Sequence, residues 1–405
     1  MRCGSLAAWL GLMAVPLVAC GNTAKNGGRE VSHAGTSSGT SGAGGASAGQ
    51  MPSAQGGTAK ADGGGTALGG NAPQHGGTNL GGASGASAGT NAAGENAVSG
   101  AGGGLVTTRV PSCAEENGTE CSGESCCTTI GLPGGAYLMG ADDEFGAVAS
   151  APEHTATVSP FSLDKYEVTV GRFRRFVEQF GTPPAPGAGA NPNLAKSGWE
   201  QQPPNQWAPN QPWWPANRAA LEASLDCEDF PTWTHEPGPG EQRPINCMNW
   251  WVAFAFCAWD GGRLPTQAEW EFAAAGGDEN RKYPWGLEPL SATRLSYNKA
   301  SGGTPGVAAA NDIVAVGSTP LGNGRWGHAD LLGSMYEWVI DTYSGTYYAQ
   351  DGNDCNDCAY MLGYSDARVQ RGGSWWNTEV FSVEQLAASR DAGLDKRGIR
   401  CARDP

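Results

Sequence analysis

The chain has 405 residues and a formal net charge of −15, with 63 glycines, 26 prolines and 12 cysteines. This acidity argues against nucleic acid as a partner, because a negatively charged protein repels a polyanion. A membrane-spanning helix is excluded by length: the apolar run at residues 6–17 falls short of the roughly 20 residues that cross a bilayer. The next run, Trp250–Trp259, is shorter still and predicts a buried helix.

The N-terminus is typical of a bacterial export signal. Arg2 supplies a positive charge, residues 6–17 are apolar, and the sequence LVAC that ends at Cys20 resembles a lipobox. This resemblance to bacterial lipoproteins implies a signal peptide at 1–20 and an acylated Cys20 as the first mature residue; an ordinary secretory signal is the alternative. No aspartate follows Cys20 to indicate inner-membrane retention. We therefore expect a lipid anchor in the cell envelope, at the periplasmic face of the outer membrane or at the cell surface.

Residues 21–110 are predicted to form a disordered tether. From Gly21 to about Leu105 the chain is rich in Gly, Ala, Ser, Thr and Asn, and it has no Phe, Tyr, Trp or Ile. Such a segment cannot bury enough apolar surface to offset the entropy lost on ordering. A flexible chain of this length spans roughly 50 Å, so it would separate a folded domain from the membrane without fixing its orientation.

The cysteine count agrees with export. Setting aside Cys3 and Cys20 leaves an even number, as in a disulfide framework of an oxidising compartment. The Cys-rich segment 111–127 holds four of them: Cys113, Cys121, Cys126 and Cys127. A small disulfide knot is favoured over a four-thiolate zinc site, because adjacent cysteines suit a tetrahedral Cx2C pair poorly. Cys355 and Cys358 have redox-motif spacing, but no thioredoxin-like pattern surrounds them, so a structural disulfide is predicted.

Residues 128–405 are long enough for one domain with a substantial core. Alternation of small, aromatic and apolar residues predicts a strand over Gly131–Gly140 and a second over His154–Asp164. Thr169 is placed to cap a helix. The apolar residues of that helix recur at helical spacing: Val170, Phe173, Phe176, Val177 and Phe180.

A later helix has its own start and stop signals. Thr266 and Glu269 have the spacing of a capping box, in which each side chain bonds the main chain of the other. Gly276-Gly277 end that helix.

The insertion at 181–217 is Pro-rich and carries several tryptophans: Trp199, Trp207, Trp213 and Trp214. They suit stacking on sugars or anchoring a peptide. Packing of the loop onto the domain explains them equally well.

Five segments together resemble the formylglycine-generating enzyme family, also called sulfatase-modifying factors. They are FSLDKYEVTVGRFRRFV (Phe161–Val177), GGRLPTQAEWEFAAAGG (Gly261–Gly277), DLLGSMYEW (Asp330–Trp338), RGGSWW (Arg371–Trp376) and GIRCAR (Gly398–Arg403). The resemblance implies an irregular α+β fold related to C-type lectins, with little regular secondary structure.

The resemblance also implies a disulfide framework. Cys257 and Cys401 match the partners of one family bridge. Ala274 and Ala387 match those of a second, so that whole bridge is missing here. Cys227 and Cys247 are candidates for a replacement.

A structural calcium site is implied by the same resemblance. The matching ligands are Asp330, Gly333, Met335 and Glu337: two carboxylates and two main-chain carbonyls, which suit a hard cation. Local capping or pairing by the two carboxylates is the alternative. A looser match suggests a second calcium around Asn298, Asn311 and Asp312.

The two cysteines that carry the family's copper chemistry have no counterpart in this chain. Catalytic members bind copper through two cysteines after the RGGS segment, where this chain has Asn377 and Ser382. Copper(I) prefers soft thiolates, so we expect no copper and no catalytic residues at these positions. The histidines of the domain are not at HxH or HxxH spacing: His154, His235 and His328. Ser374, Trp375 and Trp376 are the pocket candidates, because Ser374 matches a serine of the family's active pocket.

These features favour a tethered, non-oxidising relative that binds a peptide, protein or glycan at the cell envelope. An oxidase or related enzyme with altered active-site chemistry is one alternative. A purely structural envelope module is the other.

Overall fold

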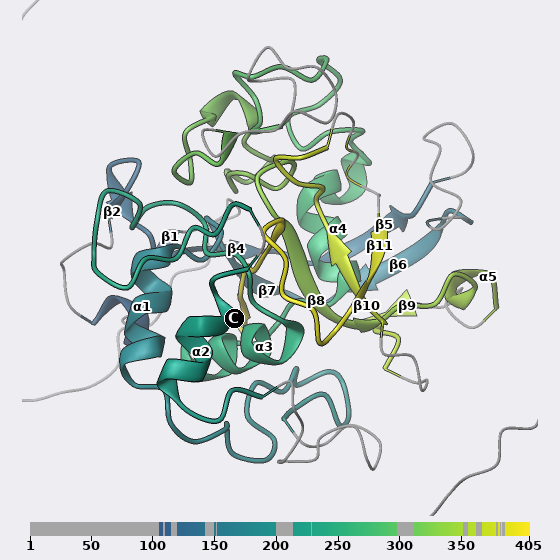
Figure 1. The fold of residues 1–405 in the computed structure, drawn as a ribbon. Coiled ribbons are helices and arrows are strands. Elements are labelled where there is room, and N and C mark those ends of the chain that lie inside the picture. Colours follow the sequence, from purple (N-terminus) through teal and green to yellow (C-terminus); the bar gives the residue numbers. More distant parts are fainter. Residues whose placement is uncertain are drawn as a thin grey trace, which may run out of the picture. The chain divides into compact units, whose positions relative to one another are not determined.

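The computed structural model describes residues 105–107, 110–114, 120–141, 150, 152–199, 214–227, 229–297, 312–350, 355–361, 367–377, 380, 382 and 385–405. All of them lie within one compact unit, 92–405, whose ribbon is shown in Figure 1. The predicted lipidation site Cys20 lies outside the described residues. None of the helices in the described part of the chain is long and apolar enough to span a membrane.

One antiparallel sheet joins the two ends of the domain. It has the order β1 (Leu105–Thr107), β4 (Thr128–Leu132), β7 (Phe161–Asp164) and β13 (Ala402–Arg403). Strand β1 lies inside the segment 21–110 that we predicted to be disordered. Its Leu-Val-Thr sequence favours strand structure, and pairing with β4 gives it a partner.

A second sheet carries the motif segments. Its order is β11 (Gln385–Ser389), β10 (Ala367–Arg371), β8 (Tyr336–Thr342) and β12 (Arg397–Gly398). Only the pairing of β12 with β8 is parallel. Every residue of β8 is buried, which places the Glu337 carboxylate in the interior.

Two smaller sheets complete the strands. One has the order β5 (Gly135–Met139), β6 (His154–Val158) and β9 (Cys355–Asn356), and the other pairs β2 (Glu120–Cys121) with β3 (Glu124–Ser125).

Each of the two strands predicted near the start of the domain is in fact two strands. Pro133-Gly134 separates β4 from β5, and Ser159-Pro160 separates β6 from β7. Proline cannot donate to a ladder. Gly134 has φ +67°, and a Cβ there would lie 2.4 Å from the Val158 carbonyl oxygen.

The helices begin where their caps predict. They are α1 (Val170–Glu178), α2 (Arg218–Ser224), α3 (Trp250–Trp259), α4 (Gln267–Ala275) and α5 (Tyr347–Gln350), with short 3-10 turns η1 (Pro111–Cys113), η3 (Gly277–Glu279) and η5 (Pro320–Gly322). Thr169 caps α1 by accepting from the Arg172 amide. Both bonds of the Thr266–Glu269 capping box are present, and Gly276 ends α4 in the left-handed conformation. These predictions are confirmed.

The largest part of the core surrounds α3. Trp250, Trp251, Phe254 and Phe256 are fully buried, since α3 is apolar on all sides and neighbouring elements enclose it. Phe173 of α1 stacks on Phe256 with ring centroids 5.4 Å apart. The confirmed helix at Trp250–Trp259 is therefore the centre of the domain.

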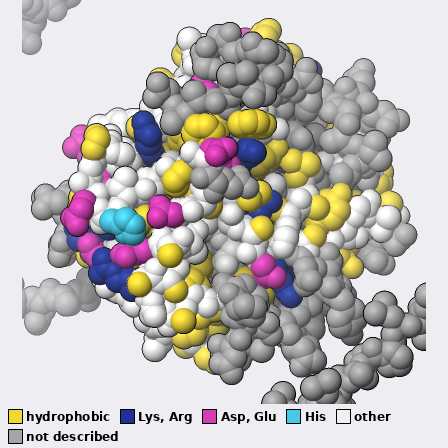
Figure 2. Space-filling view, viewed as in Figure 1, with side chains coloured by type: hydrophobic (Ala, Val, Ile, Leu, Met, Phe, Trp, Pro, Cys, Tyr) yellow, Lys and Arg dark blue, Asp and Glu magenta, His cyan; other side chains and the backbone are white. Residues whose placement is uncertain are grey.

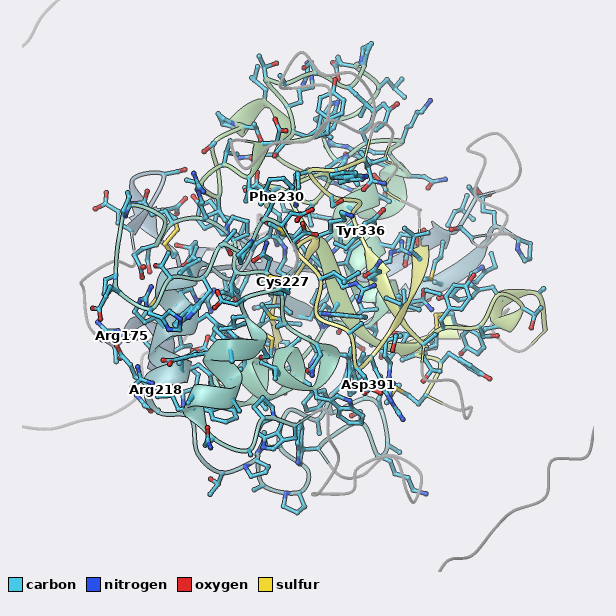
Figure 3. The ribbon with its side chains drawn as sticks, in the orientation of Figure 1. Arg175, Arg218, Cys227, Phe230, Tyr336 and Asp391 are labelled. Atoms are coloured by element: carbon cyan, nitrogen blue, oxygen red, sulfur yellow. A yellow bond between two sulfur atoms is a disulfide. The ribbon has the colours of Figure 1, made fainter. Side chains whose placement is uncertain are left out.

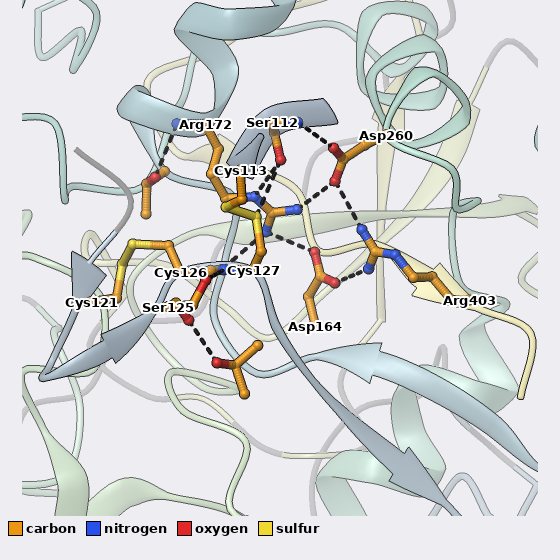
Figure 4. The surroundings of a disulfide bond; sticks show 12 residues. Ser112, Cys113, Cys121, Ser125, Cys126, Cys127, Asp164, Arg172, Asp260 and Arg403 are labelled. Carbon is orange, nitrogen blue, oxygen red and sulfur yellow. Dashed lines mark hydrogen bonds and ion pairs between the residues drawn. A yellow bond between two sulfur atoms is a disulfide. The ribbon is translucent and has the colours of Figure 1, made fainter. Parts of the chain in front are cut away.

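All cysteines from Cys113 to Cys401 are paired. The Cys-rich segment forms two disulfides, Cys113–Cys127 and Cys121–Cys126, so the structure has the disulfide knot and not the zinc site (Figure 4). The other bridges are Cys227–Cys247, Cys257–Cys401 and Cys355–Cys358. Cys227 lies near the centre of the view in Figure 3.

A buried ionic network lies beside the disulfide knot (Figure 4). The Arg172 guanidinium donates to Asp164 at 2.9 Å and to Asp260 at 2.7 Å, and Arg403 contacts both carboxylates from the other side. Ser112 joins the network by donating its amide to Asp260 and accepting from Arg172 Nε. This network fastens the Cys-rich segment to α1, α3 and the C-terminus.

Candidate functional site

The RGGS segment turns sharply at the end of β10. Gly372 and Gly373 have φ values of +94° and +69°, and a Cβ at Gly373 would lie 2.1 Å from Val380 Cγ1. Only glycine fits this turn, because other residues are strained at such φ values. The turn places Ser374 in the interior, with 0% of its surface exposed.

The Asn377 side chain closes onto Ser374. Its Oδ1 accepts from the Ser374 amide at 2.9 Å and from the Ser374 hydroxyl at 2.7 Å. The Asn377 amide in turn donates to the Ser374 carbonyl at 3.0 Å. At the first position predicted to match a copper thiolate, the Asn377 side-chain amide is therefore held by two local hydrogen-bond donors.

Ser382, at the second thiolate position, is fully buried. Its amide donates to the Lys282 carbonyl at 3.3 Å, and its carbonyl accepts from Arg371. Its hydroxyl has no hydrogen-bond partner within the described part of the chain. An amide oxygen and a hydroxyl are hard ligands, so these residues do not fit copper(I).

Beneath this loop, Arg371 forms a buried ion pair with Glu271. Burial raises the pKa of Glu271, and the Arg371 guanidinium opposes that increase. The remaining Glu271 oxygen accepts from the Gly140 amide at 2.6 Å. The carboxylate is thus held between two partners and is poorly placed to act as a free acid or base.

The predicted pocket residues differ in their surroundings. Trp375 is fully buried, packs edge-on against Phe230 with centroids 5.2 Å apart, and donates its indole N–H to the Asp395 carbonyl. Phe230 is labelled in Figure 3. Trp376 is half-buried, with Lys396 Nζ 4.3 Å from its ring centroid. Trp375 therefore belongs to the core, and Trp376 reaches the surface.

Of the predicted calcium ligands, Asp330, Gly333 and Met335 lie on the loop that leads into β8, and Glu337 lies in β8. Asp330 and Gly333 have φ values of +56° and +76°. Asp330 accepts from the Gly317 amide at 2.6 Å and from the Thr319 hydroxyl at 3.3 Å. Both Asp330 oxygens are thus engaged, as the local-capping alternative expects.

Glu337 has partners of its own. Its carboxylate accepts from Arg400 Nε at 3.0 Å and Nη2 at 2.9 Å, and from the Trp270 indole N–H at 2.7 Å.

Glu167 is a third buried carboxylate at this loop, and the sequence did not predict its place there. It accepts from the Ser334 hydroxyl at 2.7 Å and from the Met335 amide at 2.9 Å. Burial, and then the neighbouring Glu337 and Asp330, raise the pKa of Glu167 well above its ordinary value.

The loop thus has three buried carboxyl groups near the Arg400 guanidinium, and the pKa values of Glu167 and Asp330 are both raised by burial. This excess of buried oxygen ligands fits a hard cation in kind. Glu167, Asp330 and Glu337 do not together form a metal site, because the described residues contain no group of three His, Cys, Asp or Glu side chains able to hold a metal. Main-chain carbonyls would have to complete the set. Asn298 and Asn311 of the second predicted calcium site lie outside the described residues.

The histidines have separate partners. His154 stacks on Tyr348 with centroids 4.4 Å apart. Burial, and then Arg400, lower the pKa of His328 to about 3. His235 is exposed and lies 3.8 Å from both Glu222 and Asp226. On the face drawn in Figure 2, acidic side chains gather around a histidine and lie beside basic ones.

Ser374, Trp375 and Trp376 line neither of two cavities whose walls are described residues. One, of about 270 Å³, lies between α1, α3 and the insertion. The other, of about 280 Å³, lies where β5 begins.

In the insertion, Trp199 is buried and packs edge-on against Trp214, with centroids 5.4 Å apart. These two tryptophans pack the insertion onto the domain. Trp207 and Trp213 lie outside the described residues.

The fold and the motif segments define a formylglycine-generating-enzyme-like domain. Residues 114–405 match the sulfatase-modifying factor enzyme 1-like domain, and the chain belongs to this family. The family and the α+β fold predicted from the motifs are confirmed.

Two relatives differ in the activity that their names state. The chain is 31% identical over 297 residues to the inactive C-alpha-formylglycine-generating enzyme 2 of Mus musculus, covering 67% of this chain and 84% of that protein. It is 32% identical over 317 residues to the formylglycine-generating enzyme of Streptomyces coelicolor, covering 73% and 95%. The solved structure of PvdO from Pseudomonas aeruginosa is 22% identical with a TM-score of 0.49, covering 69% of this chain and 95% of that one. Membership in the family therefore does not by itself assign an activity.

Proposed function

We propose that this protein is a non-oxidising member of the family that binds a peptide, protein or glycan at the cell envelope. The observation that carries the proposal is the closure of the Asn377 amide onto Ser374, at the position of a copper thiolate. Ser382 adds a second hard group, buried under the same loop. Conversion of a substrate cysteine to formylglycine is an oxidation, and this loop lacks the soft ligands that would hold the family's copper.

The proposed location rests on the N-terminal sequence and on the cysteines. The LVAC segment supports acylation of Cys20 and attachment to a membrane through lipid. The pairing of all cysteines from Cys113 to Cys401 supports an oxidising compartment. We place the protein at the outer membrane, facing the periplasm or the exterior.

We expect the full-length mature protein to produce less than one aldehyde per molecule when supplied with copper(I), oxygen, a reductant and a cysteine-containing sulfatase peptide. Mass spectrometry of the peptide measures the aldehyde, and a catalytic family member is the positive control. Multiple turnover above a reaction without protein would overturn the proposal. In the double variant Asn377→Cys with Ser382→Cys, we expect a gain of copper(I) affinity of at least 100-fold, because two thiolates return to positions that the loop still presents.

We also propose that calcium orders the loop at Asp330, Gly333, Met335 and Glu337. An ion present at a hundred times its Kd adds about 2.7 kcal/mol to the free energy of unfolding. Each added kcal/mol raises the Tm of a domain of about 150–250 residues by roughly 2–4 °C. We therefore expect the Tm in CaCl2 to exceed that in EDTA by about 5 °C or more, measured by scanning calorimetry. Asp330→Ala is expected to abolish the difference, whereas Asp278→Ala, at an exposed carboxylate, keeps it. Equal Tm values for the unaltered protein in CaCl2 and EDTA would refute the site.

A further inference from the structure

We propose that the cavity beside Trp326 is a binding site for a neutral, hydroxyl-rich sugar ring of a glycan. The cavity has a volume of about 280 Å³ and lies between the start of β5 and the loop that carries Arg325 and Trp326. Ligand cavities for drug-sized molecules begin at about 300 Å³, so the space suits one ring with its neighbours extending outward. The inference rests on the proposed binding function and names the ligand class and the place.

The floor of the cavity is a fixed aromatic surface. The half-buried Trp326 stacks on the buried Phe272 of α4, with centroids 5.2 Å apart and planes 15° from parallel. Gly277 packs against both rings, since a Cβ there would lie 3.0 Å from Phe272 and 3.2 Å from Trp326. A pyranose has an apolar face of C–H groups that packs against such a ring, and a ring already held in place loses little conformational entropy on binding.

The rim presents a hydrogen-bond donor beside an acceptor. Arg325 Nη1 donates to the Gly276 carbonyl at 2.7 Å and to Asp278 at 2.6 Å, and its Nε lies 3.2 Å from Glu279. These contacts fix the guanidinium and leave Nη2 without a hydrogen-bond partner in the described part of the chain. The Asp278 side chain is 78% exposed, and its bond to Arg325 lowers the pKa of Asp278, which keeps the carboxylate ionised.

Neighbouring hydroxyls of a sugar match this pair. One hydroxyl can accept from Arg325 Nη2 while the next donates to the Asp278 carboxylate, and hydrogen bonds to charged partners are the stronger kind. An anionic ligand would meet Asp278, Glu279 and a chain of net charge −15. A cationic ligand would be repelled by the Arg325 guanidinium, which already pairs with both Asp278 and Glu279. The rim therefore selects an uncharged ligand that both donates and accepts.

The wall of the cavity is small and open. Gly135 and Ala136 are exposed, and a Cβ built at Gly135 would meet nothing within 4 Å. Further sugar units can pass over this wall. An extended peptide would pair through its main chain and would make little use of the aromatic floor, whereas a sugar ring packs directly on it. The geometry thus favours a glycan over an extended peptide.

The experiment titrates the full-length mature protein with three neutral trisaccharides, chitotriose, cellotriose and mannotriose, and with a proline-rich peptide, by isothermal titration calorimetry. At least one trisaccharide is expected to bind. Trp326→Ala is expected to weaken that binding at least 10-fold, and Ala136→Gln, which narrows the cavity without removing a core contact, at least 5-fold. Trp285→Ala is the matched control and keeps the affinity. Trp285 is also half-buried, stacks on Tyr283 at 5.2 Å and lies near Arg294.

Several results would overturn the inference: no binding of any trisaccharide, binding of the peptide alone, or equal losses in Trp326→Ala and Trp285→Ala. Glycan binding that survives both Trp326→Ala and Ala136→Gln but is lost in Trp376→Ala would also overturn it, while leaving the proposed binding function intact. The proposed non-oxidising function fails separately, through turnover in the peptide oxidation assay.

Discussion

Replacing Arg172 with leucine is expected to lower the free energy of unfolding by about 3–5 kcal/mol, the cost typical of breaking a buried ion pair by removing one partner. The Arg172 side chain is 0% exposed and lies between Asp164 and Asp260. Its loss leaves two buried carboxylates with Arg403 as the remaining cation of the network drawn in Figure 4. Leucine fills part of the volume of the arginine side chain, but it carries no positive charge to balance Asp164 and Asp260. Equilibrium unfolding in urea measures the difference.

The same helix supplies a control. Arg175 pairs with Glu178 at the surface, at 3.2 Å, with side-chain exposures of 25% and 41%. Surface pairs of this kind contribute little, so Arg175→Leu is expected to change the stability by less than about 0.5 kcal/mol. A loss below about 1 kcal/mol in Arg172→Leu would show that the network does not hold the domain together.

Removing the Cys257–Cys401 bridge, by replacing both residues with alanine, is expected to lower the stability by about 5 kcal/mol. The bridge spans 144 residues, and the chain-entropy model assigns the larger effects to longer loops. Both cysteines are fully buried, so the bridge joins the end of α3 to the C-terminal strand inside the core. Urea unfolding without reductant gives the change, and non-reducing peptide mapping verifies the bridge in the unaltered protein.

Cys355–Cys358 is the comparison bridge. It spans only 3 residues, so its replacement by alanines is expected to cost about 1–2 kcal/mol in the same chain-entropy model. Detection of free thiols at Cys257 and Cys401 would contradict the first expectation. Equal losses of stability on removal of the two bridges would contradict it as well.

Features encoded within a few residues could be predicted from the sequence. Thr169 caps its helix through Arg172, three residues on, and Thr266 meets Glu269 at the same spacing. The alternation of residues predicts strand structure correctly over 131–140 and 154–164, but Pro133 and Pro160, which lack an N–H group, divide each predicted strand into two. Local patterns are reliable where local hydrogen bonds decide the structure.

Much of the site depends on contacts between distant residues. Glu167 meets Ser334 across 167 positions, and no local pattern around it indicates that partner. Trp326 and Phe272 are likewise distant in the sequence, and only the fold stacks them. The prediction that Asn377 and Ser382 stand at the thiolate positions needs only the motif, whereas the closure of Asn377 onto Ser374 depends on the turn of the folded loop.

The knot formed by Cys113–Cys127 and Cys121–Cys126 has a mechanical consequence. A pull on the chain ahead of Leu105 would first load β1, which lies at the edge of its sheet and whose three residues pair, within the described part of the chain, with β4. Those few hydrogen bonds can peel away one after another. The load would next reach the Cys113–Cys127 bond, which is covalent and transfers tension to β4 at Thr128. Strand β1 is therefore the part of the described domain that such a pull would detach most easily, and the Cys113–Cys127 bond is the first covalent link that the load would meet.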